Sequence, residues 1–470
     1  MKINSPTVGP IVGYTTANEV RLWFRGKFEL VGESEYRRCF GLLRYRQSGD
    51  KVWSQPLFNK MSANFDMTCV LGVKNLIANT LYEYQAGWIF ADSDLEKISQ
   101  TTADFYSWPA EQDTYSFQSA SDNSTDSRSY IIGSCRYLLK TFFGNIFDDR
   151  GDKVFDSILK QHTKAPVNGI VMMGDQIYAD DLNFLKPDTK LPEFLLRYRT
   201  VFSQKYIQKL MSNIPTYMIL DDHEIEDNWP EKATEKDRIT VYPHAIHAYQ
   251  IYQCSHSPLF SSDLSGRIEG TLQKFWYTFS DGCSEWFVMD SRTERVINKQ
   301  KSIMIGQDQL LALTEWIRQK NGKTKLIVTS VPFAPDMTSE KNDKWGAFSD
   351  QRDIILDVIY KESDHRIIFL SGDVHCSFAA KIFHKSQAQP VAYQVVSSSF
   401  FWPYPHAKKG DFETHSSLIT QNQISEYSAV ITTDVFSDDG FCRIDIDETQ
   451  IKSTFFERKG GKLGDYICTF

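Results

Sequence analysis

The first 118 residues show the alternation of apolar and polar positions that is typical of half-buried β-strands. In the run VRLWF, Val20, Leu22 and Phe24 fall on one face, because successive side chains of a strand point to opposite faces. Further short runs of this kind follow at similar spacing: FGLLRYR, KVW, MTCVLGV and LYEYQAGW. The pattern predicts an all-β sandwich domain over residues 1–118.

The segment after this region predicts a domain boundary. Leu76 followed by NTLYEY is typical of the final corner of an immunoglobulin-like or fibronectin-like module. Residues 119–129, SASDNSTDSRS, are polar and serine-rich without apolar periodicity, which predicts a linker. We therefore expect the catalytic domain at residues 130–470.

From residue 130 onward, segments with helical spacing alternate with strand-like runs. Helical spacing occurs at residues 154–161, 193–211, 309–320 and 352–361. A hairpin is expected at Asp281-Gly282, and the runs FCRIDID and IKSTFFER predict a closing β pair. This alternation predicts the α/β class, with a layered α/β sandwich of mixed strands following the all-β domain.

Four of the strand-like runs stop abruptly at residues that can bind metal ions. The runs are IIGSC, GIVMMGDQIY, YMILDDHE and IIFLSGDVH, and the residues are Cys135, Asp175, Tyr178, Asp222, His223, Asp373 and His375. In an open α/β sheet, ligands gather beyond the carboxyl ends of the strands. Four such strands side by side would direct all of these groups into one crevice, which predicts a catalytic site with several metal ions.

The residue types indicate which metals and which chemistry to expect. Carboxylates shared between two ions hold metals about 3.5–4 Å apart, and Asp175 and Asp222 are candidates for this role. A thiolate from Cys135 and a phenolate from Tyr178 favour ferric iron, whereas Asp and Asn ligands suit Ca²⁺ or Mn²⁺. His223 directly follows Asp222, so its imidazole can give a proton to a leaving alkoxide.

Charge and cysteine content exclude several classes of function. The formal charge of −8 and the lack of a block of Lys or Arg argue against long nucleic acids as partners, whereas a small phosphorylated substrate is compatible. The eight cysteines include no C-x-x-C pair, which favours reduced thiols. There is no P-loop around Gly322 and no G-x-S-x-G motif, so nucleotide-driven enzymes and serine hydrolases are not indicated.

The sequence also predicts where the protein acts. It contains no uninterrupted apolar stretch long enough to cross a bilayer, and the residues after Met1 show no signal-peptide pattern. We therefore expect a globular, soluble chain in the cytoplasm that does not contact membranes. The oligomeric state is left open.

The motifs GSC, GDQIYADD, DDHEIEDNW, MDSRTER and SGDVH resemble the signature set of the alkaline phosphatase D family. These are PhoD-like metallophosphatases within the calcineurin-like phosphoesterase superfamily. The resemblance covers nearly the whole chain, because GPIVGYTTANEVRLWFR and LIANTLYEYQAGW are similar to the N-terminal domain of that family. It implies a layered α/β/β/α metallophosphoesterase-type sandwich that binds iron and calcium, with His223 as the acid. The implied metal ligands are Cys135, Asp175, Tyr178, Asp222, Asn228, Asp373 and His375.

The sequence departs from the wider superfamily at two motifs. Ser134-Cys135 replaces the usual opening Asp-x-His, and Gly372-Asp373-Val374-His375 replaces Gly-His-x-His. Both replacements are typical of the PhoD branch. Family members are often exported, which contrasts with the expected cytoplasmic location.

Arg292, which follows the strand that ends at Asp290, has two possible roles. It could contact the phosphate of a substrate, or it could brace a neighbouring carboxylate through an ion pair. We retain it as a candidate substrate-binding residue. Trp402, with Trp229, Phe400 and Phe401, is a candidate for the rim of the pocket, although such side chains more often belong to the core.

The sequence as a whole predicts a metal-dependent phosphoric ester hydrolase that acts on monoesters, diesters or both. Hydroxide generated at the metals would attack phosphorus, and His223 would protonate the leaving group. The alternative is a catalytically idle scaffold protein of the same fold that retains its metals for structure. The leaving group and the preferred ester class are left open.

Overall fold

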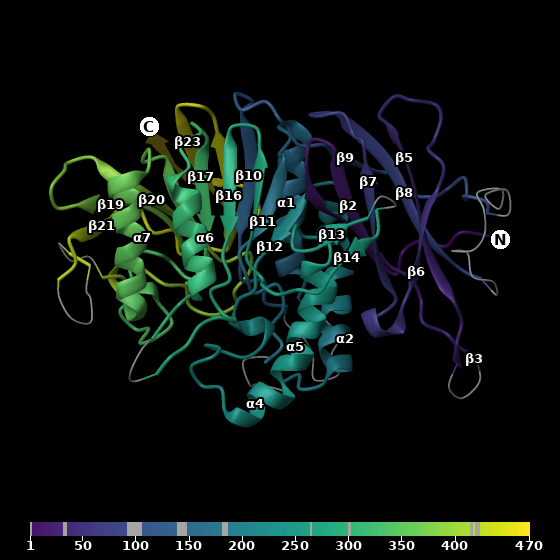
Figure 1. The fold of residues 1–470 in the computed structure, drawn as a ribbon, viewed down its shortest axis with the longest axis horizontal. Coiled ribbons are helices and arrows are strands. Elements are labelled where there is room, and N and C mark those ends of the chain that lie inside the picture. Colours follow the sequence, from purple (N-terminus) through teal and green to yellow (C-terminus); the bar gives the residue numbers. More distant parts are fainter. Residues whose placement is uncertain are drawn as a thin grey trace. The chain divides into compact units, whose positions relative to one another are not determined.

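The computed structural model describes residues 2–31, 35–91, 106–138, 148–180, 187–263, 266–298, 302–413, 417–418 and 424–470. Contacts within this part of the chain divide it into two compact units (Figure 1). The first unit comprises Met1–Asp122, Leu195–Tyr217 and His247–Gln273. The second comprises Asn123–Phe194, Met218–Ile246 and Lys274–Phe470.

The first unit contains the predicted β-rich N-terminal region. A three-stranded sheet has the order β1-β2-β7, and a four-stranded sheet has the order β6-β5-β8-β9. The strands are β1 (Val8–Thr15), β2 (Glu19–Arg25), β5 (Cys39–Gln47), β6 (Leu57–Met61), β7 (Thr68–Lys74), β8 (Leu81–Phe90) and β9 (Tyr115–Gln118), with a small hairpin of β3 (Leu30–Val31) and β4 (Glu35–Tyr36). Val20, Leu22 and Phe24 of β2 share one core with residues of β5 and β8, as their alternation predicts.

Two later segments of the chain complete the first unit. They carry most of α2 (Leu191–Phe202), all of α3 (Lys205–Met211), a π-helical turn at Gln250–Cys254, and the strands β13 (Ser261–Ser262) and β14 (Ile268–Glu269). Asp66 connects these segments to the sandwich, because it accepts hydrogen bonds from Arg25 at 3.0 Å, Arg199 at 2.7 Å and the Tyr252 hydroxyl at 2.5 Å. Both segments lie within the range predicted for the catalytic domain. The boundaries at residues 118 and 130 themselves stay a prediction.

The second unit is built around two sheets. The larger has the order β15-β16-β17-β18-β20-β19-β21, and the neighbours from β16 to β20 are parallel. Its strands are β15 (Tyr277–Asp281), β16 (Ser284–Val288), β17 (Thr324–Val328), β18 (Ile367–Ser371), β19 (Ser377–His384), β20 (Pro390–Ser397) and β21 (Tyr427–Ile431). The predicted hairpin at Asp281-Gly282 is confirmed, since Asp281 of β15 pairs with Ser284 of β16.

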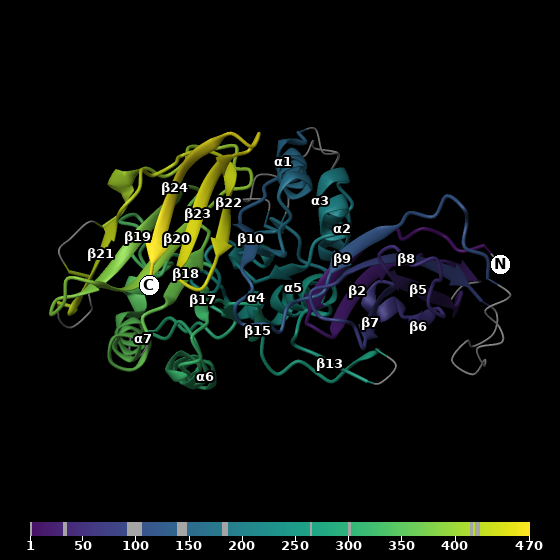
Figure 2. The same cartoon turned by 90° about the horizontal axis from the view of Figure 1, so that it is seen from above.

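Two helices cover one face of this sheet. They are α6 (Gln307–Arg318) and α7 (Ser349–Glu362), close to the ranges predicted from apolar spacing. Figure 2 shows both on the same side of β17 and β18. Leu313 of α6 and Ile355 of α7 share a buried core with Ile327 and Phe369 of the sheet.

The second sheet has the order β12-β11-β10-β22-β23-β24. Its strands are β10 (Arg128–Gly133), β11 (Gly169–Met172), β12 (Thr216–Met218), β22 (Gly440–Ile446), β23 (Gln450–Glu457) and β24 (Lys462–Thr469). The parallel strands β10 and β11 are connected through α1 (Arg150–Lys164), as expected for a β-α-β unit. The closing pair predicted from FCRIDID and IKSTFFER is confirmed as β22 and β23, and β24 extends it.

The two sheets of the second unit are in contact. The rings of Tyr130 in β10 and Trp286 in β16 lie 4.6 Å apart, and the Ser397 hydroxyl of β20 donates to the Ile132 carbonyl of β10 at 3.1 Å. The layered α/β sandwich is therefore confirmed. None of the helices in the described ranges is long and apolar enough to span a bilayer.

The expectation that the four ligand-bearing strands are neighbours in one sheet is wrong. Cys135, Asp175 and Asp222 follow β10, β11 and β12, which belong to the six-stranded sheet. Asp373 follows β18, which belongs to the seven-stranded sheet. Apolar runs indicate where a strand ends, but not which strand it pairs with, because pairing depends on residues far away in the sequence. The ligands nevertheless converge, because the two sheets are in contact.

Candidate metal centre

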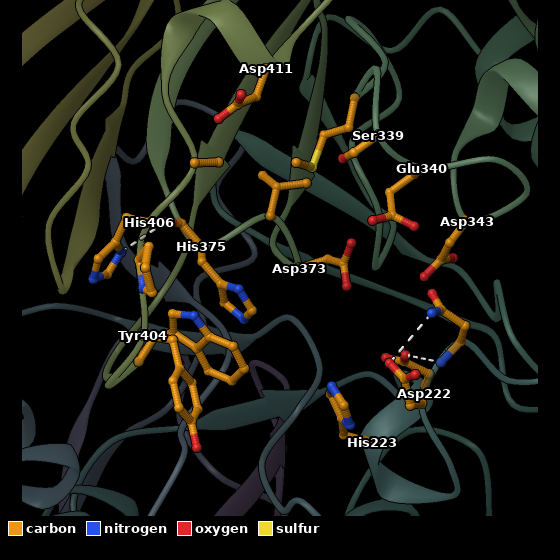
Figure 3. A pocket seen from close by; sticks show the side chains of 17 residues that line it. Asp222, His223, Ser339, Glu340, Asp343, Asp373, His375, Tyr404, His406 and Asp411 are labelled. Carbon is orange, nitrogen blue, oxygen red and sulfur yellow. Dashed lines mark hydrogen bonds between the residues drawn. The ribbon is translucent and has the colours of Figure 1, made fainter. Parts of the chain in front are cut away.

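The second unit contains a cavity of about 660 Å³ into which several predicted site residues project (Figure 3). Asp222, His223, Asn228, Asp373 and His375 line it. Acidic residues from other loops and the aromatic residues Trp402 and Tyr404 complete the wall. The ring of Trp402 is stacked on the imidazole of His375, with the ring centroids 3.8 Å apart.

The backbone turns sharply at most of these positions. Five predicted site residues have a positive φ, namely Cys135 (55°), Asp175 (55°), Asn228 (58°), Asp373 (67°) and His375 (50°). This left-handed conformation costs a non-glycine residue on the order of 1–2 kcal/mol, and such residues cluster at functional sites. The strands therefore end in strained turns at the residues that carry candidate ligands.

Asp175 lies at the centre of the candidate ligands. Three groups of side chains have ligand atoms within 4.8 Å of one another, and Asp175 belongs to all of them. The groups are Cys135, Asp175 and His375; Asp175, Asp222 and His223; and Asp175, Asp221, Asp222 and Asp373. The Tyr178 hydroxyl also reaches Asp175, at 3.3 Å from Oδ2. This arrangement is what a carboxylate shared between two ions requires.

Unpaired polar atoms at this position fit bound cations. Asp175 Oδ1, Asp221 Oδ2 and His375 Nε2 are buried without a hydrogen-bond partner. Buried polar atoms in folded proteins are nearly always paired, so three unpaired acceptors within one site are unusual. Carboxylate oxygen and imidazole nitrogen are ordinary metal ligands, so cations bound at the groups that contain these residues could satisfy the unpaired atoms.

Burial makes the thiol and the phenol at the site poor acids on their own. Burial, followed by the charge of Asp175, raises the pKa of Cys135 well above its usual range. The same two causes raise the pKa of Tyr178. A bound metal ion would reverse this effect, because coordination to a cation stabilises the thiolate and the phenolate and the protons are released to solvent.

His223 is held in place by a carboxylate that the sequence analysis missed. Its Nδ1 lies 2.9 Å from Oδ2 of Asp180, which is 1% exposed. Burial disfavours the charged imidazole, but Asp222, Asp180 and Asp175 outweigh it and raise the pKa of His223 well above its ordinary value. Asp180 lies within the motif GDQIYADD, so the motif itself contained the signal for this residue.

The Arg292 side chain is buried among the carboxylates of the candidate metal centre. Its side chain is 0% exposed and is not among the residues that line the cavity. Its guanidinium donates to Asp221 Oδ1 at 2.5 Å, to Asp343 at 2.7 and 3.1 Å, and to the Trp229 carbonyl at 3.2 Å. Of the two roles considered for Arg292, these contacts support the bracing of carboxylates, and contact with the substrate stays a prediction.

Two further carboxylates at the site were not predicted. Asp221 directly precedes Asp222, and its position at the end of the same strand could have drawn attention to it. Asp343 lies in a loop, within the sequence KNDKW. No apolar run precedes it that would mark the end of a strand. Backbone contacts also shape the site, since the Asn228 N–H donates to Asp222 Oδ2 at 2.6 Å.

Gly372 is needed where the two sheets meet at the site. A β-carbon at this position would lie 2.0 Å from Ser134 Oγ and 2.4 Å from Ser134 Cβ. We expect Gly372→Ala to lower the free energy of unfolding by about 1–3 kcal/mol, as overpacking does, and to weaken metal binding at the adjacent Asp373 and Cys135. Urea unfolding checks the first effect. Gly410→Ala is the control, because its β-carbon would meet nothing within 4 Å, and equal stability of the two variants would contradict the prediction.

Comparisons with known proteins agree with these observations. The family model described as PhoD-like phosphatase matches residues 148–455. Alkaline phosphatase D of Bacillus subtilis (strain 168) is 23% identical in an alignment of 235 residues, and the match covers 44% of this chain. That match spans 40% of the length of the relative.

A solved structure described as "Structure of PhoD" has a similar fold. It superimposes with a TM-score of 0.71 and 15% sequence identity, and the match covers 99% of this chain and 89% of the other. The family model covers about two thirds of the chain and includes every predicted site residue except Cys135. The chain therefore belongs to the PhoD-like phosphatase family.

Proposed function

We propose that this protein is a metal-dependent hydrolase of phosphoric esters. The observation that carries the proposal is the convergence of three groups of ligand atoms on Asp175, next to His223 and at the wall of a cavity. Membership in the PhoD-like phosphatase family supports the same activity. A small phosphorylated molecule is the expected substrate, and both monoesters and diesters are candidates.

The residues of the site divide into two sets of ligands. Cys135, Tyr178 and His375 would hold an iron(III) ion together with Asp175, because thiolate, phenolate and imidazole suit a polarising metal. Oxygen atoms of Asp222, Asn228 and Asp373 would hold Ca²⁺ or another divalent ion such as Mn²⁺. When bound, these metals supply Lewis acidity, which polarises the phosphoryl oxygens and lowers the pKa of water.

The charge of the cavity wall supports a role for metal ions in binding phosphate. Among the described residues that line the cavity, none is an arginine or a lysine, whereas six are acidic: Asp222, Asp227, Glu340, Asp343, Asp373 and Asp411. A phosphate group would be repelled by such a wall unless cations compensated it. Arg292 is buried and engaged by carboxylates, so contact between its guanidinium and the phosphate stays a prediction.

His223 is the residue that we assign as the general acid. Asp180 accepts from Nδ1 and therefore fixes both the ring orientation and the tautomer, which leaves Nε2 to face the substrate. The carboxylates around the ring raise its pKa and keep a proton on it at neutral pH. His223 Nε2 can then pass this proton to the departing alkoxide.

We expect Asp180→Asn to lower kcat by about tenfold to a hundredfold with little change in KM. This decrease in kcat is smaller than the decrease expected when a general acid itself is removed. Removal of the Asp180 charge also lowers the pKa of His223, so the alkaline fall in activity should move to lower pH. A pH–rate profile measures both effects. Asp227→Asn is the control, because Asp227 also lines the cavity but pairs with Lys232.

The proposal is tested by elemental analysis of the purified protein together with turnover of an aryl phosphate monoester and an aryl phosphate diester. We expect bound iron or another transition metal and hydrolysis of at least one ester. A fully metallated protein that turns over neither ester would instead favour the metal-binding scaffold.

A further inference from the structure

Arg292 contacts more carboxylates than an ordinary ion pair requires. Its guanidinium nitrogens lie 2.5 Å from Asp221, 2.7 Å from Asp343, 3.4 Å from Asp222 and 3.9 Å from Asp373. The arginine is fully buried, and each of these four carboxylate side chains is at most 17% exposed. One fixed positive charge is therefore shared among four acidic groups with little access to water.

Three of these four carboxylates belong to a group that could hold a cation. Oxygen atoms of Asp221, Asp222 and Asp373, together with Asp175, lie within 4.8 Å of one another. Within this group, one oxygen of Asp221 faces Arg292 Nε, and its other oxygen, Oδ2, is buried without a hydrogen-bond partner. Asp221 therefore accepts from Arg292 with one carboxylate oxygen, and its other carboxylate oxygen is available to a cation.

Unlike Asp221, Asp343 uses both of its carboxylate oxygens in hydrogen bonds. Both of its oxygens accept from Arg292, and Oδ1 also accepts from Arg295 at 2.5 Å. Nevertheless Asp343 lines the same cavity as the proposed oxygen ligands Asp222 and Asp373 (Figure 3). Without the Arg292 guanidinium, Asp221 would be an uncompensated carboxylate at the site, and Asp343 would keep only its ion pair with Arg295.

We propose that Arg292 is a positioning residue that takes the place of a further metal ion. Its guanidinium neutralises Asp221 and Asp343 and so fixes how many cations the remaining ligands bind. This inference rests on the proposed function, since it requires a site that binds metals. The planar fork of arginine suits the role, because it bonds to several carboxylate oxygens at once, whereas a lysine presents a point charge.

The inference predicts the metal content of variants. In Arg292→Gln, Asp221 loses the guanidinium that faces it and Asp343 keeps only Arg295, so we expect one additional divalent ion per chain in buffer with excess Ca²⁺ or Mn²⁺. Arg292→Lys keeps the charge and should bind the same number of ions as the wild type. The experiment is elemental analysis of full-length protein after equilibrium dialysis, with thermal unfolding measured at each cation concentration.

Arg352→Gln is the matched control. Arg352 is also fully buried, and it forms an ion pair at 2.7 Å with Asp336, which belongs to no candidate ligand group among the described residues. This variant should therefore gain no metal, and its loss of stability should not depend on added cation.

The outcomes separate the inference from the proposed function. If the wild type binds no metal, the proposed function fails. If the wild type binds metal but folded Arg292→Gln gains none, the inference alone is overturned. If Arg292→Gln is insoluble without cation, its rescue by Ca²⁺ or Mn²⁺ supports the inference, and equal insolubility with and without cation contradicts it.

Discussion

Replacing Asp175 with asparagine abolishes ester hydrolysis, and the loss is not reversed by added metal. This result is expected because Asp175 belongs to every candidate ligand group, so the substitution removes the anionic ligand that the groups share. Chelation of the wild-type protein should reduce turnover to background in the same way, but readdition of metal should restore it. Steady-state assays with paired elemental analysis measure both effects.

Metal binding should also change the thermal stability of the protein. A metal that binds the folded chain and not the unfolded one stabilises the fold, so chelation should lower the melting temperature of the wild type. In Asp175→Asn the melting temperature should hardly respond to a chelator. Asp152→Asn is a suitable control, because Asp152 is also buried but pairs with Arg136 and belongs to no candidate ligand group among the described residues. Full activity of metal-depleted wild type would refute the assignment.

Replacing His223 with alanine lowers kcat by about 10²–10⁴-fold while the metal content stays intact, as expected for the loss of a general acid. The loss should be largest for alkyl esters, whose leaving group needs a proton, and smaller for p-nitrophenyl esters, whose leaving group departs as a stable anion. Because the pKa of His223 is raised, its proton is retained through neutral pH and lost at alkaline pH. The alkaline fall in wild-type activity should therefore disappear in the variant.

His384→Ala provides a matched comparison. His384 is also buried and lies 3.3 Å from a carboxylate, Glu426, but it does not line the cavity. We expect this variant to retain wild-type kcat and the alkaline fall in activity. Equal turnover of an alkyl ester by His223→Ala and wild type would remove His223 from the acid role.

The sequence allowed the candidate ligands to be identified, but not the arrangement of the strands that carry them. Cys135, Asp175, Asp222 and Asp373 each follow an apolar run, and the structure brings them to one site. Their distribution over two sheets depends on pairings such as β10 with β22, which are separated by about 300 residues and leave no local signal. The predicted helix at residues 193–211 is likewise two helices, which the pattern alone did not separate.

The residues that support the ligands were harder to predict. Asp180 and Asp343 lie in loops, where no periodic pattern indicates the direction of a side chain. Arg292 was identified from the sequence as a candidate, but its burial could not be predicted. The motif MDSRTER reads the same whether the guanidinium faces a substrate or a carboxylate. Burial and partner are properties of the folded chain.

The left-handed backbone at Cys135, Asp175, Asn228, Asp373 and His375 limits how this protein can be engineered. Glycine adopts this conformation without strain, so each of the five positions is one where a change to glycine relaxes the chain. Each is also a residue that we assign to metal binding. In metal-free buffer, selection for heat resistance alone would therefore favour substitutions at the positions where they inactivate the enzyme, and such a screen for thermostable variants must include turnover as a second criterion.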